Sequence, residues 1–218
     1  MSTSKETQGQ KGKLLSADAR QKLLAFASLI GLMAFFSFAS PSFMQIDNIM
    51  GILQSTAVNG VLAIACTFII ITAGIDLAVG TLMTFCAVMT GVVLVYWELP
   101  FVLGIAAAIL TGAFIGAVNG TMIAKMKIPP FIATLGMMVS ARGLARYYTE
   151  GQPVSMLSDS YTAIGHGAMP VIIFLVVAVI FHIALRYTKY GKYTYAIGGN
   201  MQAARTSGIN VKRHLIIV

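Results

Sequence analysis

Long apolar runs, separated by short polar segments, fill most of this chain after a polar beginning. A helix that crosses a membrane needs about 20 largely apolar residues. Six runs come close to that length or exceed it, and each predicts one spanning helix: residues 23–39, 56–73, 77–97, 101–124, 128–148 and 169–187. The pattern therefore predicts an all-α fold, a polytopic transmembrane helical bundle whose membrane domain extends over residues 23–187.

The second and third runs join into one apolar stretch, residues 57–97, which is about twice as long as a bilayer requires. A turn must divide it, and we expect that turn near Gly74-Ile75-Asp76. Asp76 is the only acidic residue of the stretch. An isolated carboxylate at membrane depth is costly and suggests a role in a pathway, whereas at a hydrated turn Asp76 can accept from the amides of Ala78 or Val79 and cap the third helix. Both interpretations stay open.

The basic residues predict the orientation, because Lys and Arg are enriched in cytoplasmic loops. Six spans with a cytoplasmic N-terminus leave only Arg142 and Arg146 outside. Because these arginines interrupt the fifth run, a re-entrant segment is the alternative there. Such a segment would turn the basic residues from Arg186 to Arg213 outward, so the charge pattern favours a span. The thirteen residues then inside are Lys5, Lys11, Lys13, Arg20, Lys22, Lys125, Lys127, Arg186, Lys189, Lys192, Arg205, Lys212 and Arg213, and the outer loops are residues 38–55, 98–100 and 148–168.

The two ends of the chain differ from its apolar middle. Residues 1–22 form a polar, basic tail that we expect in the cytoplasm. The apolar run after this tail is longer than the core of a signal peptide, so it predicts an uncleaved anchor. Residues 214–218 read HLIIV, which is typical of the start of a further span. We therefore expect the sequence to be cut at the start of a seventh helix.

Composition narrows the function further. Hydrophobic residues make up 57% of the chain and charged residues 10%, which is typical of membrane proteins. The net charge of +8 lies mostly in loops, so it indicates orientation and does not point to a nucleic-acid partner. Cys66 and Cys86 lie in apolar runs without metal-ligand spacing, so we expect neither a metal site nor a disulfide. The sequence suggests no catalytic residue.

Small residues recur at every fourth position of the fourth run: Gly104, Ala108, Gly112, Gly116 and Gly120. Small residues let helices approach closely in a membrane, where apolar burial does not drive association. We therefore expect Gly104, Gly112, Gly116 and Gly120 to pack against another helix. Asn119 in the same run is one of several neutral polar residues that could line a path for a polyol. Most such residues in membrane helices bond to the backbone or to a neighbouring helix instead.

The segment 188–213 is polar, basic and punctuated by glycine. Gly198 and Gly199 are expected to break the chain, and Asn200 is a good N-cap for a short helix from Met201 to Ser207. Gly208 is placed to end that helix in a left-handed conformation. Two roles are open for this cytoplasmic helix: it transmits force to the membrane bundle, or it is an interfacial segment held by anionic lipid.

Three motifs, in order, carry a family resemblance: GIDLAVGTLM, GAVNGTMIAKMKIPPFIATLGMMVSARGLA and YGKYTYAIGGNMQAARTSGINVKR. Together they resemble the permease subunits of ribose-type ATP-binding-cassette (ABC) sugar importers, over most of the chain from about Thr56 onward. In that family the loop corresponding to residues 196–211 is the coupling segment, whose short helix inserts into a groove on the ATPase subunit. Gln202-Ala203-Ala204 followed by Gly208 resembles the family's E-A-A-x-x-x-G pattern, with Gln202 in place of its glutamate.

The resemblance implies a permease that moves a ribose-like monosaccharide across the bacterial cytoplasmic (inner) membrane and catalyses no reaction itself. It implies that Gly198, Gly199, Asn200, Gln202, Ala203, Ala204 and Gly208 contribute to coupling with the ATPase. The implied partners are cytoplasmic ATPase subunits that bind the ATP, a second permease subunit, identical or homologous, and an extracytoplasmic sugar-binding protein. No cofactor is implied for this chain.

Three alternatives remain. Related permeases also carry branched-chain amino acids. An ion-coupled secondary carrier is a second alternative, although such a carrier usually needs ionisable groups at the midplane, and the chain has none placed there clearly. A membrane-anchored interaction protein without transport is the third.

Overall fold

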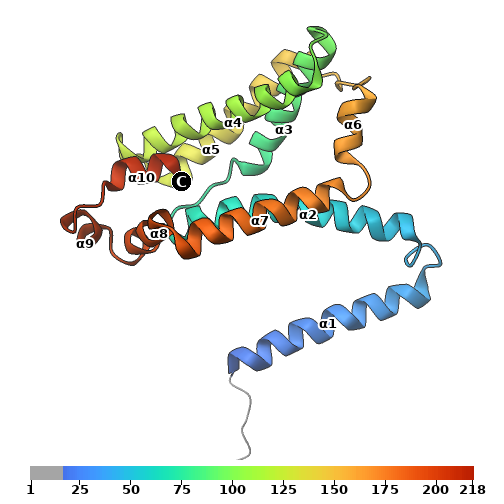
Figure 1. The fold of residues 1–218 in the computed structure, drawn as a ribbon, viewed down its shortest axis with the longest axis horizontal. Helices are drawn as coiled ribbons and strands as arrows, with labels where there is room; N and C mark the ends of the chain where they lie inside the picture. The colour runs from blue at the N-terminus through green and yellow to red at the C-terminus, as the bar shows by residue number, and fades with distance from the viewer. Residues whose placement is uncertain (1–16) are drawn as a thin grey trace, which may run out of the picture. The chain divides into compact units, whose positions relative to one another are not determined.

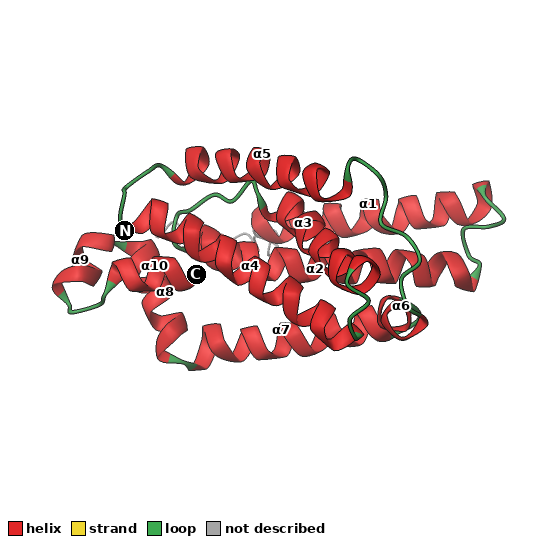
Figure 2. Cartoon of the chain, turned by 90° about the horizontal axis from the view of Figure 1, so that it is seen from above, coloured by secondary structure: helices red, strands yellow, loops and turns green. Residues whose placement is uncertain are grey.

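The computed structural model describes residues 17–218, so the greater part of the predicted basic tail lies outside the described residues. The described part consists of helices and connections, with no strand in it (Figure 2). The predicted all-α bundle is therefore confirmed. The chain divides into two compact units, residues 1–51 and 52–218. The helices are α1 (Ala17–Ala39), α2 (Ile46–Ile71), α3 (Val79–Gly91), α4 (Phe101–Ala124), α5 (Pro130–Thr149), α6 (Asp159–Gly165), α7 (Met169–Tyr187), α8 (Lys189–Gly199), α9 (Met201–Thr206) and α10 (Val211–Ile217), and a π-helical turn, η1 (Val92–Tyr96), follows α3.

The first unit contains α1 and the beginning of α2. Large apolar side chains of α1 are exposed, among them Leu24, Phe26 and Phe35, as expected of a helix surrounded by lipid. The outer loop predicted for residues 38–55 is partly wrong, because α2 begins at Ile46. Residues 46–55 mix polar and apolar side chains, so a search for apolar runs rejects them although they continue the helix. The side-chain amide of Asn48 donates to the Phe43 carbonyl (2.8 Å) and so ties this helix start to the preceding turn.

In the second unit, α3, α4 and α5 form a compact group (Figure 1). Phe85, Ile115 and Ala141, one residue from each of these helices, form a buried cluster. Ala141 is completely buried, so its small side chain allows α5 to approach α3 and α4 closely.

The helices α2, α7 and α8 are joined by aromatic contacts. The Phe68 ring of α2 lies with its centroid 5.5 Å from that of Phe181 on α7 and 5.8 Å from that of Tyr190 on α8. Gly60 of α2 faces the Phe174 ring so closely that a Cβ there would meet it. These contacts position α8 beside the end of α2.

Five helices of residues 17–218 are long and apolar enough to cross a membrane: α1, α2, α3 with η1, α4 and α7. The predicted ends of the fourth and sixth runs coincide with those of α4 and α7. The fifth run forms a helix, α5, but Arg142 and Arg146 keep it outside this group, and its crossing stays a prediction. The predicted outer loop 148–168 also contains a helix, α6, that the sequence did not suggest.

The turn expected near Gly74-Ile75-Asp76 is confirmed. The helix α2 ends at Ile71 and α3 begins at Val79. Ala73 adopts a left-handed conformation (φ 60°), which ends α2 although the residue is not a glycine.

Candidate functional site

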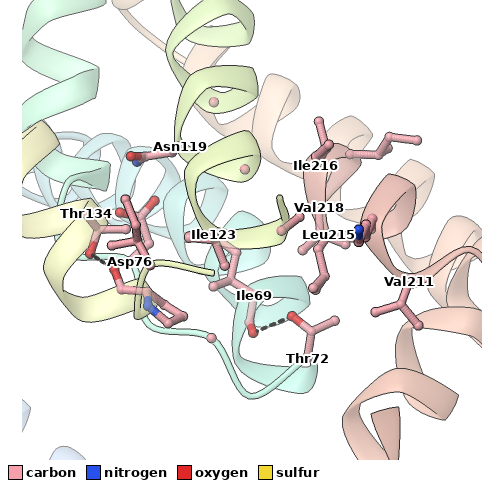
Figure 3. Close-up of a pocket in the computed structure, with 18 of the residues that line it drawn as sticks. Ile69, Thr72, Asp76, Asn119, Ile123, Thr134, Val211, Leu215, Ile216 and Val218 are labelled. Atoms are coloured by element: carbon pink, nitrogen blue, oxygen red, sulfur yellow. Dashed lines mark hydrogen bonds between the residues drawn. The ribbon is translucent and has the colours of Figure 1, made fainter. Parts of the chain in front are cut away.

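Three connecting regions gather at one end of the second unit and line a cavity of about 800 Å³. They are the α2–α3 connection, the α4–α5 connection and the segment from α9 to α10. The charge pattern predicts that all three lie on the same side of the membrane, and their proximity fits that prediction. Figure 3 shows the cavity with side chains from α2, α4 and α10 around it.

Asp76 lies in the α2–α3 connection, partly buried, at the wall of this cavity. Its Oδ1 accepts a hydrogen bond from the Ala78 amide (2.7 Å), so the expected contact with the start of α3 is confirmed for Ala78. The hydroxyl of Thr134 on α5 lies 3.4 Å from the Ile75 carbonyl oxygen and holds the same connection. The contact with Ala78 does not remove Asp76 from the cavity, so its pathway interpretation stays open.

Asn119 of α4 lines the same cavity and is only 6% exposed. Its Oδ1 is buried and has no hydrogen-bond partner among the described residues. Figure 3 shows the Asn119 amide on the side of α4 that faces Asp76 and Thr134. Most buried side-chain acceptors in proteins have a partner, so this one is unusual.

The expected packing of the α4 glycines against another helix is found for Gly104, Gly112 and Gly120 and is wrong for Gly116, and the four glycines do not share one surface. Four residues of an α-helix turn through about 400°, which is about 40° more than one full turn. Positions four residues apart therefore point in directions about 40° apart, and Gly104 and Gly120 point in directions about 160° apart. Gly104 faces Thr90 and Leu94, and Gly112 faces Cys86. Gly116 has nothing within 4 Å and lines the cavity. Gly120 meets the backbone of α10, where a Cβ would lie 2.8 Å from the Cα of Ile216.

This geometry predicts opposite results for two substitutions on α4. Gly120→Leu should lower the yield of monodisperse, detergent-extracted protein at least threefold, because the side chain would collide with the α10 backbone. Gly116→Leu is the matched control and should keep a yield close to that of the unchanged protein, since the space around Gly116 is open. Size-exclusion profiles at equal expression measure both. Equal yields from the two variants would contradict the close contact between α4 and α10.

The segment 188–213 is more helical than the sequence indicated. It was expected to be a loop with one short helix, but it contains α8, α9 and the start of α10. The residues of α8, KYGKYTYAIGG, have low helix propensity, so its contacts with the rest of the unit must stabilise it. A Cβ at Gly191 would overlap the Leu185 carbonyl oxygen, and one at Gly198 would overlap that of Ile71. Gly198 and Gly199 therefore do not break the chain: they complete α8.

Both predicted caps of the short helix are confirmed. The Asn200 side-chain oxygen accepts from the amides of Gln202 and Ala203 (3.0 Å each), and Gly208 is left-handed (φ 86°). The helix itself, α9, ends at Thr206, one residue before the predicted end. Its bounds and both caps thus follow from local sequence.

The packing of α9 differs from the arrangement implied by the resemblance. Ala204 is only 4% exposed, because it packs against Ile197 of α8 and Val211 of α10. Ala204 itself is therefore not available to a partner's groove, because the chain covers it. Gln202 and Ala203 are exposed instead.

A polar and aromatic cluster that the sequence did not suggest joins α8 to α10. The Thr194 hydroxyl and His214 Nε2 lie 2.9 Å apart, and both residues are buried. The Tyr190 ring lies with its centroid 4.8 Å from that of His214. Burial raises the pKa of the Tyr190 phenol, so the phenol is neutral at physiological pH. Tyr190 and Thr194 lie four residues apart along α8, but nothing local connects either residue to His214.

No group of His, Cys, Asp and Glu side chains that could hold a metal ion occurs within residues 17–218. The arrangement instead combines apolar helices, a cavity with neutral and acidic acceptors at one end, and a folded basic segment beside it.

Residues 48–218 match the family described as the permease component of the branched-chain amino acid transport system. The chain belongs to this family. A permease component is not itself catalytic. With five helices able to span a membrane, the permease is a multi-pass membrane protein.

Curated relatives of the permease carry the names of sugar transporters. This chain is 39% identical over 207 residues to a ribose import permease protein of Haemophilus influenzae. The alignment covers 89% of this chain and 62% of the relative. The chain is 41% identical over 203 residues to that of Escherichia coli, which covers 88% and 62%. The xylose transport system permease protein of Haemophilus influenzae is 29% identical over 273 aligned positions, covering 94% and 72%. The chain thus spans about three fifths of the length of the ribose import permeases. No solved structure matches it.

Proposed function

We propose that this chain is a membrane-spanning permease subunit, or a part of one, of an ABC importer that moves a ribose-like monosaccharide into the cell. The observation that carries the proposal is the identity of about two residues in five to ribose import permeases over almost nine tenths of the chain. The membrane-length helices, and the cavity at one end of the second unit, fit a protein that forms part of a transport path.

The proposal includes partners outside this chain. Two cytoplasmic ATPase subunits supply the energy, a second permease copy or homologue completes the path, and an extracytoplasmic binding protein delivers the sugar. The exposed residues of α9, Gln202 and Ala203, are the proposed contacts with the ATPase. The segments 125–127 and 188–213 are basic, which supports a cytoplasmic position for this end and for the N-terminus in a bacterial inner membrane.

A branched-chain amino acid is the second candidate substrate, because the matching family is described by that substrate class. Relatives named for ribose, xylose and fructose favour the sugar. A branched-chain amino acid is a zwitterion at neutral pH, whereas a monosaccharide carries no ionised group, and uptake of each labelled compound can be measured separately.

The test is uptake by proteoliposomes that contain the complete importer with its ATPase and binding protein. Labelled D-ribose should enter proteoliposomes whose lumen contains ATP and whose ATPase subunits face that lumen. Without ATP in the lumen, uptake should fall at least tenfold. Dissipating the proton and sodium gradients with ionophores should leave the rate within twofold. Uptake that depends on the ion gradients and not on ATP would establish a secondary carrier. Uptake of L-leucine in place of D-ribose would establish a branched-chain amino acid as the substrate.

A further inference from the structure

The cavity has the size and lining of a small-molecule site. Its volume of about 800 Å³ lies within the range of about 300–1,000 Å³ that is usual for such sites. Aliphatic side chains, among them Ile69, Ile123 and Ile216, form most of the wall. A few polar groups interrupt this wall, which is the pattern that orients a bound ligand.

Two hydrogen-bond acceptors of the wall have capacity for a ligand. Asn119 Oδ1 is buried without any partner among the described residues. Leaving such an acceptor unsatisfied is costly, so a donor is expected there. An ionised carboxylate accepts about four hydrogen bonds, and the bond from Ala78 occupies only part of the capacity of Asp76.

The two threonine hydroxyls of the wall do not compete for these acceptors. The hydroxyl of Thr134 donates within its own helix, to the Pro130 carbonyl oxygen (2.9 Å), and that of Thr72 donates to the Ile69 carbonyl oxygen (2.9 Å). Both hydroxyls are thus used by the backbone. Neither hydroxyl supplies a donor to Asn119 or Asp76.

The charges on the wall limit the class of ligand. Lys127, Arg205 and Lys212 also line the cavity, but all three are exposed. Their charge is therefore screened by solvent, whereas the carboxylate of Asp76 is partly buried and would repel an anion. A ligand at Asn119 and Asp76 should offer several donors and carry no negative charge.

We propose that this cavity binds a neutral polyol, with two hydroxyl groups of a monosaccharide donating to Asn119 Oδ1 and to the Asp76 carboxylate. This inference rests on the proposed function and assigns to it a sugar contact near the cytoplasmic end of the path. A polyol satisfies both acceptors at once, and its carbon-bound hydrogens pack against the aliphatic wall.

The first measurement is ATP-driven uptake of D-ribose by the complete importer at saturating binding protein. Asn119→Leu keeps the size of the side chain and removes the acceptor, so uptake should fall about tenfold. Thr72→Val is the matched control: Thr72 lines the same cavity and is equally buried at 6% exposed, but its hydroxyl is already bonded to Ile69. Its uptake should stay within twofold. Asp76→Asn keeps an oxygen acceptor, so its loss should be less than threefold.

The second measurement detects the ligand in the cavity itself. A single cysteine, Gly116→Cys or Ala113→Cys, is introduced where Cys66 and Cys86 have been replaced, and its alkylation by a soluble maleimide is followed. Both positions line the cavity and are exposed. Millimolar D-ribose should slow alkylation at least threefold, Asn119→Leu should abolish this protection, and Thr72→Val should retain it. A purely structural role of Asn119 would not change protection by the sugar.

Each contrary result has a distinct meaning. If the unchanged importer moves D-ribose but the sugar never protects the cysteine, the binding site is wrong and the proposed function stands. Protection by L-leucine and not by D-ribose, with a large loss in Asp76→Asn, would assign an ammonium group to Asp76 and overturn the polyol. Protection that persists in Asn119→Leu would remove Asn119 from the site. Absence of any ATP-driven D-ribose uptake by the unchanged importer would overturn the proposed function and, with it, this inference.

Discussion

Gly198→Ala is expected to reduce ATP-driven D-ribose uptake by the complete importer at least tenfold at matched expression. A methyl group at this position would overlap the carbonyl oxygen of Ile71 at the end of α2. Neither the added Cβ nor the Ile71 carbonyl oxygen belongs to a flexible side chain, so the end of α8 must move away from α2. Because α9 follows α8 directly, this movement would also displace the segment that we propose to contact the ATPase.

Gly199→Ala is the matched control, since a Cβ there has nothing within 4 Å. Its uptake should remain within twofold of the unchanged importer. Helix propensity alone predicts a gain from either substitution, because alanine is favoured over glycine by about 1 kcal/mol inside a helix. The two effects thus have opposite signs at Gly198, and similar uptake in the two variants would contradict the contact between α8 and α2.

The features that the sequence predicted well depend on local physics. The length of an apolar run is measured against one bilayer, so α4 and α7 were predicted with their observed ends. Capping and turn contacts involve residues two or three positions apart, so the Asn200 cap and the contact of Asp76 with Ala78 before α3 were predictable from the residues themselves. Positive φ at Gly208 follows from the absence of a Cβ.

The features that the sequence did not predict depend on contacts between distant segments. Gly198 and Gly199 are adjacent and look alike, yet only Gly198 meets the backbone of a helix more than 120 positions earlier. Likewise, Thr194 meets His214 across a change of direction that no local pattern specifies.

The candidate site divides in the same way. Asp76 and Asn119 were identified as polar residues in apolar surroundings, which is a local observation. That both line one cavity depends on how α4 lies relative to the α2–α3 connection. The glycines of α4 face different neighbours, and Gly116 faces none, for a related reason: equal spacing along the sequence is not equal direction around a helix.

Ala204→Asp should disorder the segment from α8 to α10 and abolish uptake. Ala204 lies in a buried cluster with Ile197 and Val211, and a carboxylate placed there has no opposite charge in that cluster. Burial of an unpaired charge costs several kcal/mol. The six residues of α9 cannot form a stable helix without this packing. Protease added to the cytoplasmic side of membrane vesicles should cleave the segment at least tenfold faster than in the unchanged protein.

Ala203→Asp introduces the same side chain one residue earlier, at an exposed position. Protease resistance should therefore be unchanged, while ATP-driven uptake and the amount of ATPase that co-purifies should each fall about fivefold if α9 docks there. Because the two variants differ only in which face of α9 carries the carboxylate, they separate the folding of the segment from its contact with the partner. Full uptake and ATPase binding in Ala203→Asp would exclude this face of α9 as the contact. Unchanged protease resistance in Ala204→Asp would contradict the packing of α9 between α8 and α10.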